Sequence, residues 1–136
     1  GAAPTRLIVS GRRAPHIVRD DHVHKGGDAA LIAQLRKLSG TDDTVLDDEA
    51  VLALILPALR ADYHAVETYS WASGSPLSCP ITAVIGDVDP RVDEAAANEW
   101  RRHTTGPFDL HILPGGHFYF GEGAIGVAGL LREILR

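Results

Sequence analysis

The order of hydrophobic and polar positions divides the chain into three short apolar runs separated by helical patterns. The apolar runs have the length of strands and occupy residues 5–10, 81–86 and 108–114. The middle run, ITAVIG, is apolar almost throughout, which is typical of a strand buried on both faces of a parallel sheet. The first run leads directly to Gly11, as expected for a buried strand that enters a functional loop.

Helical periodicity fills much of the remaining sequence. Four helices are predicted: one from Asp28 as N-cap to Gly40 as its end, one over 51–66 that Pro57 splits or kinks, one over 93–103, and a closing one over 124–136. The stretch 12–28 is predicted to be a loop. From residue 80 onward the order is strand, helix, strand, helix, which favours the α/β class: a parallel sheet with right-handed crossovers and helices on its faces.

Composition is that of one ordinary folded domain, because 136 residues with 45% hydrophobic side chains can bury a core. The net charge is -5, and the basic pairs at 12–13 and 101–102 are too short to follow a phosphate backbone, so nucleic acid is not expected as a partner. The sequence has no apolar run of bilayer length and no basic-then-apolar leader. We therefore expect no membrane association and a cytoplasmic location.

The lone cysteine and the first residues carry less information. Cys79 cannot form a disulfide within the chain, and its position just before Pro80 predicts a small buried hydrophobic residue rather than a catalytic thiol. The chain contains no methionine and opens with GAAPT, which resembles the start of a segment cut from a longer sequence.

Candidate chemistry gathers after the second and third predicted strands. Asp87 and Asp89 follow the second strand in IGDVDP, and His117 follows the third in LPGGHFYF. Because the carboxyl ends of parallel strands lie at one edge of the sheet, a carboxylate there can orient the imidazole and leave its other nitrogen as a general base. The glycine pair before His117 would let the backbone turn tightly and direct the imidazole into that site. Each motif alone also occurs in ordinary turns.

The other chemically active side chains are weaker candidates. His22 and His24, with Asp20 and Asp21, suggest a metal site, but a polar loop of this composition is more often solvated. We therefore expect neither a metal nor a cofactor. Several serines adjoin a glycine, but the G-x-S-x-G nucleophile elbow does not occur in the sequence.

Five segments together resemble a known family in order and spacing. They are LIVSGRRAP, ALIAQLRKLSGT, LILPALRADYHAVETY, CPITAVIGDVDP and HTTGPFDLHILPGGHFYF. Across nearly the whole chain they are similar to the stand-alone type II thioesterases of polyketide and nonribosomal peptide biosynthesis, which are α/β-hydrolases.

The resemblance implies a division of roles along the chain. Residues 28–69 would be the helical lid inserted between two strands, Asp89 the acid of a Ser-His-Asp triad, and His117 its base. Asp87 is the less favoured acid. In the family the serine elbow lies upstream, so residues 1–136 resemble the C-terminal half of one α/β-hydrolase domain. The N-terminal half would be a partner, and this chain alone would be inactive.

The function implied is hydrolysis of stalled or wrongly loaded acyl groups from the phosphopantetheine arm of an acyl or peptidyl carrier protein. Two alternatives stay open at this point. One is a different α/β-hydrolase activity, esterase or acyltransferase, since the same acid and base would serve it. The other is a non-catalytic module that binds a carrier protein or an acyl chain through the leucine-rich helices.

Overall fold

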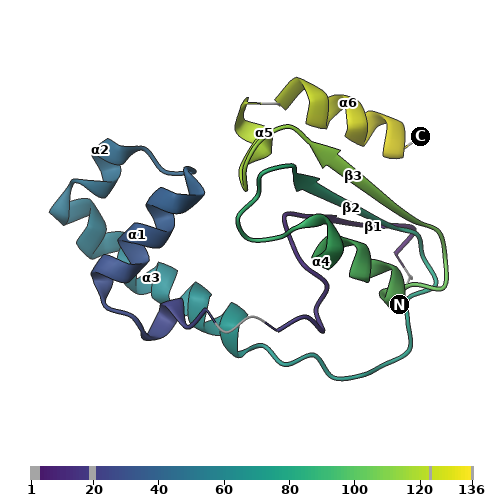
Figure 1. Cartoon of the computed structure of the whole chain (residues 1–136), viewed down its shortest axis with the longest axis horizontal. Coiled ribbons are helices and arrows are strands. Elements are labelled where there is room, and N and C mark those ends of the chain that lie inside the picture. Colours follow the sequence, from purple (N-terminus) through teal and green to yellow (C-terminus); the bar gives the residue numbers. More distant parts are fainter. Residues whose placement is uncertain (1–3, 19–20, 123, 136) are drawn as a thin grey trace. The chain divides into compact units, whose positions relative to one another are not determined.

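The computed structural model describes residues 4–18, 21–122 and 124–135, and the chain divides into two compact units. The sheet unit comprises Gly1–Pro15 and Ser73–Arg136. The helical unit comprises His16–Ala72. Figure 1 shows the strands and α4 to α6 in the first unit and α1 to α3 in the second.

The sheet unit is built on three parallel strands. They are β1 (Leu7–Ser10), β2 (Ile81–Gly86) and β3 (Phe108–Leu113), in the order β1-β2-β3. All six residues of β2 are buried, which confirms the prediction for ITAVIG. The outer strands of the described sheet, β1 and β3, keep partial exposure. The predicted parallel α/β arrangement is therefore confirmed for this part of the chain.

The segment between β2 and β3 forms one helix that changes type. Asp93 caps α4 (Glu94–Asn98) by accepting from Ala96 N at 2.8 Å, and the chain continues as the 3₁₀ helix η2 (Glu99–His103). The sequence predicted a single α-helix here. The tighter second half accompanies two tertiary hydrogen bonds, one from Trp100 Nε1 to Arg12 O at 2.8 Å and one from Leu77 N to His103 O at 2.8 Å.

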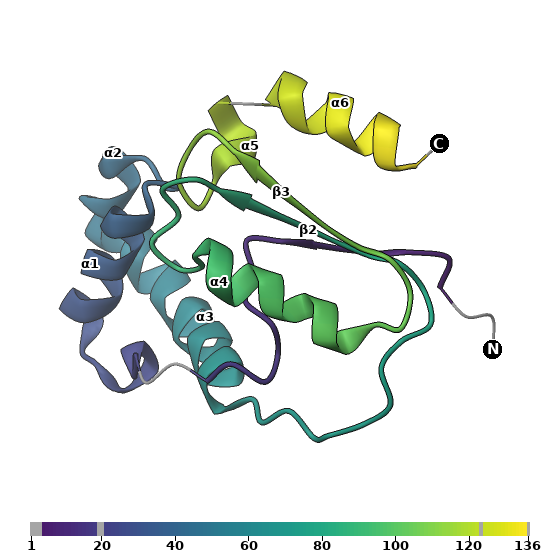
Figure 2. The same ribbon diagram turned by 45° about the vertical axis from the view of Figure 1, so that its right-hand side comes forward.

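A small core forms where α4 packs on β2. It contains Ile85, Val92 and Ala97, with Leu110 of β3 packed against them. After β3 the chain forms α5 (Tyr119–Glu122), which the sequence pattern did not predict, and α6 (Ala124–Ile134), which it did. In Figures 1 and 2, α6 runs beside β3. Residue 136, the last of the predicted closing helix, lies outside the described residues.

The helical unit contains one 3₁₀ turn and three α-helices. They are η1 (Val23–Lys25), α1 (Asp28–Leu38), α2 (Asp43–Leu46) and α3 (Glu49–Thr68). Their buried residues are all leucines: Leu31 and Leu35 of α1, Leu46 of α2 and Leu56 of α3. The predicted helical character of 28–69 is confirmed, whereas η1 and α2 were missed because each is a single short turn.

Both predicted ends of α1 are wrong by one residue. Gly27 is the N-cap, and Asp28 is already helical, with its Oδ1 accepting from Arg60 Nη2 at 2.7 Å. At the other end Ser39 rather than Gly40 takes the left-handed conformation, with φ of 53°. The Asp28 carboxylate therefore binds a neighbouring helix instead of capping its own.

Pro57 does not split α3, which overturns one of the two predicted outcomes, a split or a kink. The helix runs without interruption from Glu49 to Thr68. The ring of Pro57 removes the hydrogen bond that residue 57 would donate to the carbonyl of Ala53. Both Ala53 and Pro57 are exposed, so water can satisfy that carbonyl, while the adjacent Leu56 is buried and holds the helix in place.

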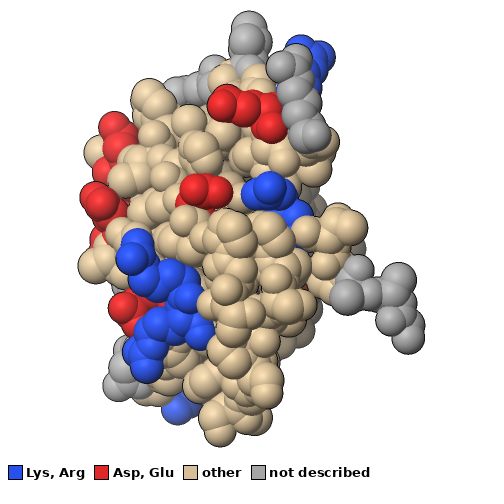
Figure 3. Space-filling view, turned by 90° about the vertical axis from the view of Figure 1, so that its right-hand side faces the viewer, with Lys and Arg blue, Asp and Glu red and all other residues tan. Residues whose placement is uncertain are grey.

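Figure 3 shows one face of the molecule, on which Lys and Arg side chains form a small patch beside acidic side chains within a mostly uncharged surface. Among the described residues, none of the helices combines the length and the apolar character that crossing a bilayer requires. Cys79 is buried, as predicted.

Candidate active site

The turn after β2 is joined to the loop after β3 by backbone hydrogen bonds. The last residues of the two strands, Gly86 and Leu113, are partners in the parallel register. Beyond them Asp87 N donates to Leu113 O at 2.9 Å, and Val88 N donates to Gly115 O at 3.2 Å. The two loops therefore stay paired past the ends of the strands, and residues 28 positions apart in sequence meet there.

Two glycines make this close approach possible. A Cβ at Gly86 would lie 2.2 Å from Gly115 O, which no side chain can do without displacing the loop. Gly115 has φ of +125°, a conformation that other residues rarely adopt. A Cβ at Gly116 would meet nothing within 4 Å. The predicted need for a glycine pair thus holds at Gly115 and not at Gly116.

His117 and Asp89 form the centre of this edge. His117 Nδ1 lies 2.9 Å from Asp89 Oδ2 and 3.1 Å from Oδ1. The Asp89 side chain is fully buried and that of His117 is 23% exposed. Arg91 N donates to Asp89 Oδ1 at 2.7 Å, which fixes the carboxylate. The predicted hydrogen bond between His117 and Asp89 is confirmed.

This geometry sets the chemistry of the imidazole. A buried carboxylate favours the tautomer in which Nδ1 carries the hydrogen, so Nε2 becomes the basic nitrogen. The same negative charge stabilises the imidazolium that forms when Nε2 accepts a proton. The pair has the arrangement of a general base and the acid that orients it.

Asp87, the alternative acid, has a different partner. Its side chain belongs to an exposed residue, and its Oδ1 accepts from Gly115 N at 2.8 Å. The carboxylate therefore supports the loop that carries His117, while Asp89 contacts the imidazole itself. The structure favours Asp89 over Asp87 as the partner of His117, in agreement with the sequence prediction.

Sequence reasoning missed the residues that surround the pair. A Cβ at Gly11 would lie 3.2 Å from His117 Cε1, so the backbone after β1 flanks the imidazole. Ser10 Oγ lies 2.7 Å from the hydroxyl of Tyr119, which is only 4% exposed. A buried tyrosine requires a partner for its hydroxyl, and that requirement was the available signal in HFYF.

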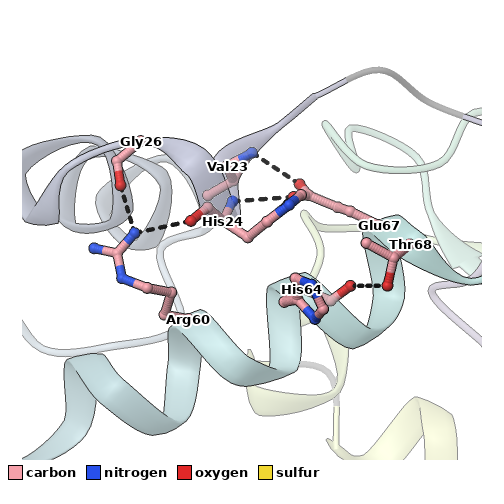
Figure 4. Close-up of polar contacts among 7 residues, drawn as sticks. All are labelled: Val23, His24, Gly26, Arg60, His64, Glu67 and Thr68. Atoms are coloured by element: carbon pink, nitrogen blue, oxygen red, sulfur yellow. Dashed lines mark hydrogen bonds and ion pairs between the residues drawn. The ribbon is translucent and has the colours of Figure 1, made fainter.

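His24 of the helical unit is held to α3 by hydrogen bonds. Glu67 of α3 accepts from Val23 N at 3.0 Å, from His24 N at 3.0 Å and from His24 Nδ1 at 2.5 Å, as Figure 4 shows. Arg60 donates to the carbonyls of His24, at 2.9 Å, and Gly26. His24 is thus bound to α3 rather than solvated, contrary to the prediction.

Within the described residues, no three His, Cys, Asp or Glu side chains are placed to hold a metal ion. Asp20, part of the metal hypothesis, lies outside the described residues.

These contacts lower the pKa of the Glu67 carboxyl. Burial alone would raise the pKa of its carboxyl, but the hydrogen bonds from the backbone and ring of His24 and from Val23 N outweigh burial, so the net pKa is lowered. An anionic Glu67 therefore stabilises the helical unit.

Comparison with known proteins identifies the family. The thioesterase domain family matches residues 1–135. The chain belongs to this family. It is 49% identical, over 122 residues, to thioesterase PikA5 of Streptomyces venezuelae, covering 90% of this chain and 43% of that protein.

Solved thioesterases share the fold of the chain. The type II thioesterase BorB from the borrelidin biosynthetic cluster is 43% identical with a TM-score of 0.84, covering 98% of this chain and 55% of that one. The thioesterase RedJ from the prodiginine pathway of Streptomyces coelicolor is 42% identical with a TM-score of 0.78, covering 85% and 43%. The resemblance to type II thioesterases is therefore confirmed. The chain spans about half the length of these relatives.

Proposed function

We propose that this thioesterase-family chain supplies the base and the acid of a Ser-His-Asp triad that hydrolyses acyl thioesters. The hydrogen bond from His117 Nδ1 to the buried Asp89 carboxylate carries the proposal. A serine from the rest of the protein would provide the nucleophile, because the G-x-S-x-G elbow does not occur in this sequence. On this proposal the chain represents the C-terminal part of an α/β-hydrolase domain and is inactive alone.

The reaction would proceed in two halves. His117 Nε2 removes the serine proton as the serine oxygen attacks the thioester carbonyl, and the imidazolium then protonates the departing thiol sulfur as the carbon–sulfur bond breaks. In the second half, His117 takes a proton from water, whose oxygen attacks the acyl-serine ester. The imidazolium returns that proton to the serine oxygen, and the carboxylic acid leaves. Asp89 stays ionised throughout and balances the imidazolium charge.

The proposed substrate is an acyl group on the phosphopantetheine arm of an acyl or peptidyl carrier protein. Two relatives support this assignment, since BorB is described as a type II thioesterase of the borrelidin cluster and RedJ as a thioesterase of the prodiginine pathway. The helical segment at 28–69 would act as the lid over the acyl chain. The removal of unwanted acyl groups from an assembly line would be the biological role.

The test uses the full-length protein that contains this sequence. Asp89→Asn should lower kcat/KM on a simple acyl thioester by on the order of 10²-fold or more, because the amide no longer holds the proton-accepting tautomer of His117. Asp87→Asn is the matched control and should cost far less, since one amide oxygen can still accept from Gly115 N.

The opposite ranking, with Asp87→Asn the more damaging change, would overturn the assignment of the acid. If Asp89→Asn leaves kcat/KM unchanged, the triad proposal is wrong. A second assay compares hydrolysis of the thioester with hydrolysis of an oxygen ester of the same acyl group. A general esterase should hydrolyse the two at similar rates.

A further inference from the structure

Two hydroxyl groups meet next to the loop that carries His117, one from the buried Tyr119 and one from Ser10, an exposed residue at the end of β1. Tyr119 follows that loop as the first residue of α5, and its side chain is 4% exposed. Its hydroxyl lies 2.7 Å from Ser10 Oγ and donates to Val84 O at 3.4 Å. A tyrosine hydroxyl has one hydrogen, so when it points to Val84 O the serine hydroxyl must be the donor between the two.

The tyrosine also shapes the loop directly. Tyr119 N donates to Gly116 O at 3.3 Å, which closes the turn that contains His117. A Cβ at Gly115 would lie 3.1 Å from Tyr119 Cβ, so the turn wraps closely around the base of the tyrosine side chain. A displacement of Tyr119 would therefore move both residues that precede His117.

The other end of the hydroxyl pair leads back to the imidazole. Ser10 ends β1, and the next residue, Gly11, donates from its N to Val84 O at 2.9 Å and flanks His117 Cε1. Val84 O thus accepts both from Gly11 N and from the Tyr119 hydroxyl. The hydroxyl pair connects the strand end beside the imidazole to the loop that holds the imidazole.

We infer that Tyr119 and Ser10 are positioning residues that hold the imidazole of His117 against Asp89. Their hydroxyls bind each other, and that of Tyr119 also binds Val84 O, so the pair fixes the two backbone segments on either side of the ring. The inference rests on the proposed function for its kinetic consequence, whereas the placement of the ring can be measured without it.

Tyr119 is suited to this role because it stays uncharged. Burial raises the pKa of its hydroxyl, the hydrogen bond with Ser10 lowers it, and the negative charge of Asp89 raises it, with a net upward shift. At neutral pH the phenol therefore keeps its hydrogen and can both donate and accept.

The test uses Tyr119→Phe, Ser10→Ala and the double variant in the full-length protein. Tyr119→Phe retains the ring and removes only the hydroxyl, and Tyr69→Phe, at a tyrosine that is 58% exposed, is the matched control. We expect each single change to lower kcat by about 3–10-fold, the range for one hydrogen bond, with KM nearly unchanged. The double variant should be no worse than the more damaged single one, since both remove the same interaction.

The deciding readout is the NMR signal of the His117 ring, assigned with His117→Ala. The Nδ1 proton and the ring nitrogens should shift in Tyr119→Phe and Ser10→Ala and stay in place in Tyr69→Phe. A His117 signal that is unchanged in both site variants overturns the inference, whatever happens to kcat.

A shifted signal with unchanged kcat would support the positioning role and contradict the proposed function, because a misplaced base must slow a reaction that uses it. If Tyr119→Phe fails to fold, Ser10→Ala leaves the tyrosine in place and decides the question alone.

Discussion

Each unit of the chain contains a histidine whose Nδ1 contacts a buried carboxylate, and the two pairs differ in what surrounds them. Asp89 is fully buried and binds His117, whose side chain is 23% exposed. Glu67 is 3% exposed and binds His24, whose side chain is only 10% exposed. The contact distances, 2.9 Å and 2.5 Å, both lie within hydrogen-bond range.

The environment of each carboxylate distinguishes the two pairs. Glu67 accepts from two backbone N–H groups besides the His24 ring, so it holds a chain segment to a helix. Asp89 accepts from Arg91 N and from His117, which lies on a loop at the carboxyl edge of a parallel sheet. A histidine–carboxylate contact alone therefore does not identify a catalytic pair; its position in the fold does.

The largest expected effect separates the two histidines by activity. In the full-length protein, His117→Ala should lower kcat/KM on an acyl thioester by on the order of 10²-fold or more, because the general base is lost. His24→Ala should leave kcat/KM close to the wild-type value. Steady-state kinetics of both variants check this, and similar losses in the two would show that the pairs do not differ in role.

The next effect concerns the backbone that places His117. Gly86→Ala puts a Cβ 2.2 Å from Gly115 O and should push the His117 loop outward, with a loss of roughly 10–100-fold in kcat/KM. Gly116→Ala is the control, because a Cβ there meets nothing within 4 Å. If the two alanine variants have equal kcat/KM, the close approach of the two loops is not required for activity.

A smaller effect is expected for the pair in the helical unit. Glu67→Gln should destabilise that unit by about 1–3 kcal/mol, since a charged acceptor of three hydrogen bonds is lost. Hydrogen exchange at the amides of Val23 and His24 measures this directly. Asp62→Asn removes the same charge from an exposed position of α3 and should leave the protection of both amides unchanged.

The smallest effect is a response to acid. The pKa of Glu67 is lowered from its ordinary value of 4.5, so its stabilising contribution is complete above that value and is lost as the pH falls through the folded pKa. Protection of the Val23 and His24 amides, corrected for intrinsic exchange, should therefore decline below about pH 4.5. Glu67→Gln should lack this part of the decline, and an identical acid profile in the two proteins would contradict it.

The sequence pattern predicted the sheet and the edge at which Asp87, Asp89 and His117 gather, because both depend on local signals, and the resemblance to type II thioesterases selected Asp89 over Asp87. ITAVIG is a strand by composition alone, and Asp89 and His117 follow predicted strands directly. Once the strands are parallel, their carboxyl ends meet at one edge, so the topology places a carboxylate near His117 but does not choose between Asp87 and Asp89.

The features that were missed depend on contacts between distant residues. The bond between Ser10 and Tyr119 joins positions 109 apart in sequence, and no local pattern predicts it. Glu67 lies 43 residues from His24, so a loop that looks solvated is held by a helix far along the chain. Pro57 was predicted to split or kink α3, but the helix runs unsplit from Glu49 to Thr68, and Ala53, whose carbonyl loses its hydrogen bond, is an exposed residue.

The turn after β2 offers a place for a reporter group. Val88 uses its backbone N–H to bind Gly115 O, while its side chain is 71% exposed. Val88, which directly precedes Asp89, is therefore largely in solvent. Cys79, the single cysteine of the sequence, is buried and shielded from reagents. A fluorophore attached through Val88→Cys would sit beside the candidate active site and signal the arrival of an acyl chain without disturbing the hydrogen bond between Asp89 and His117.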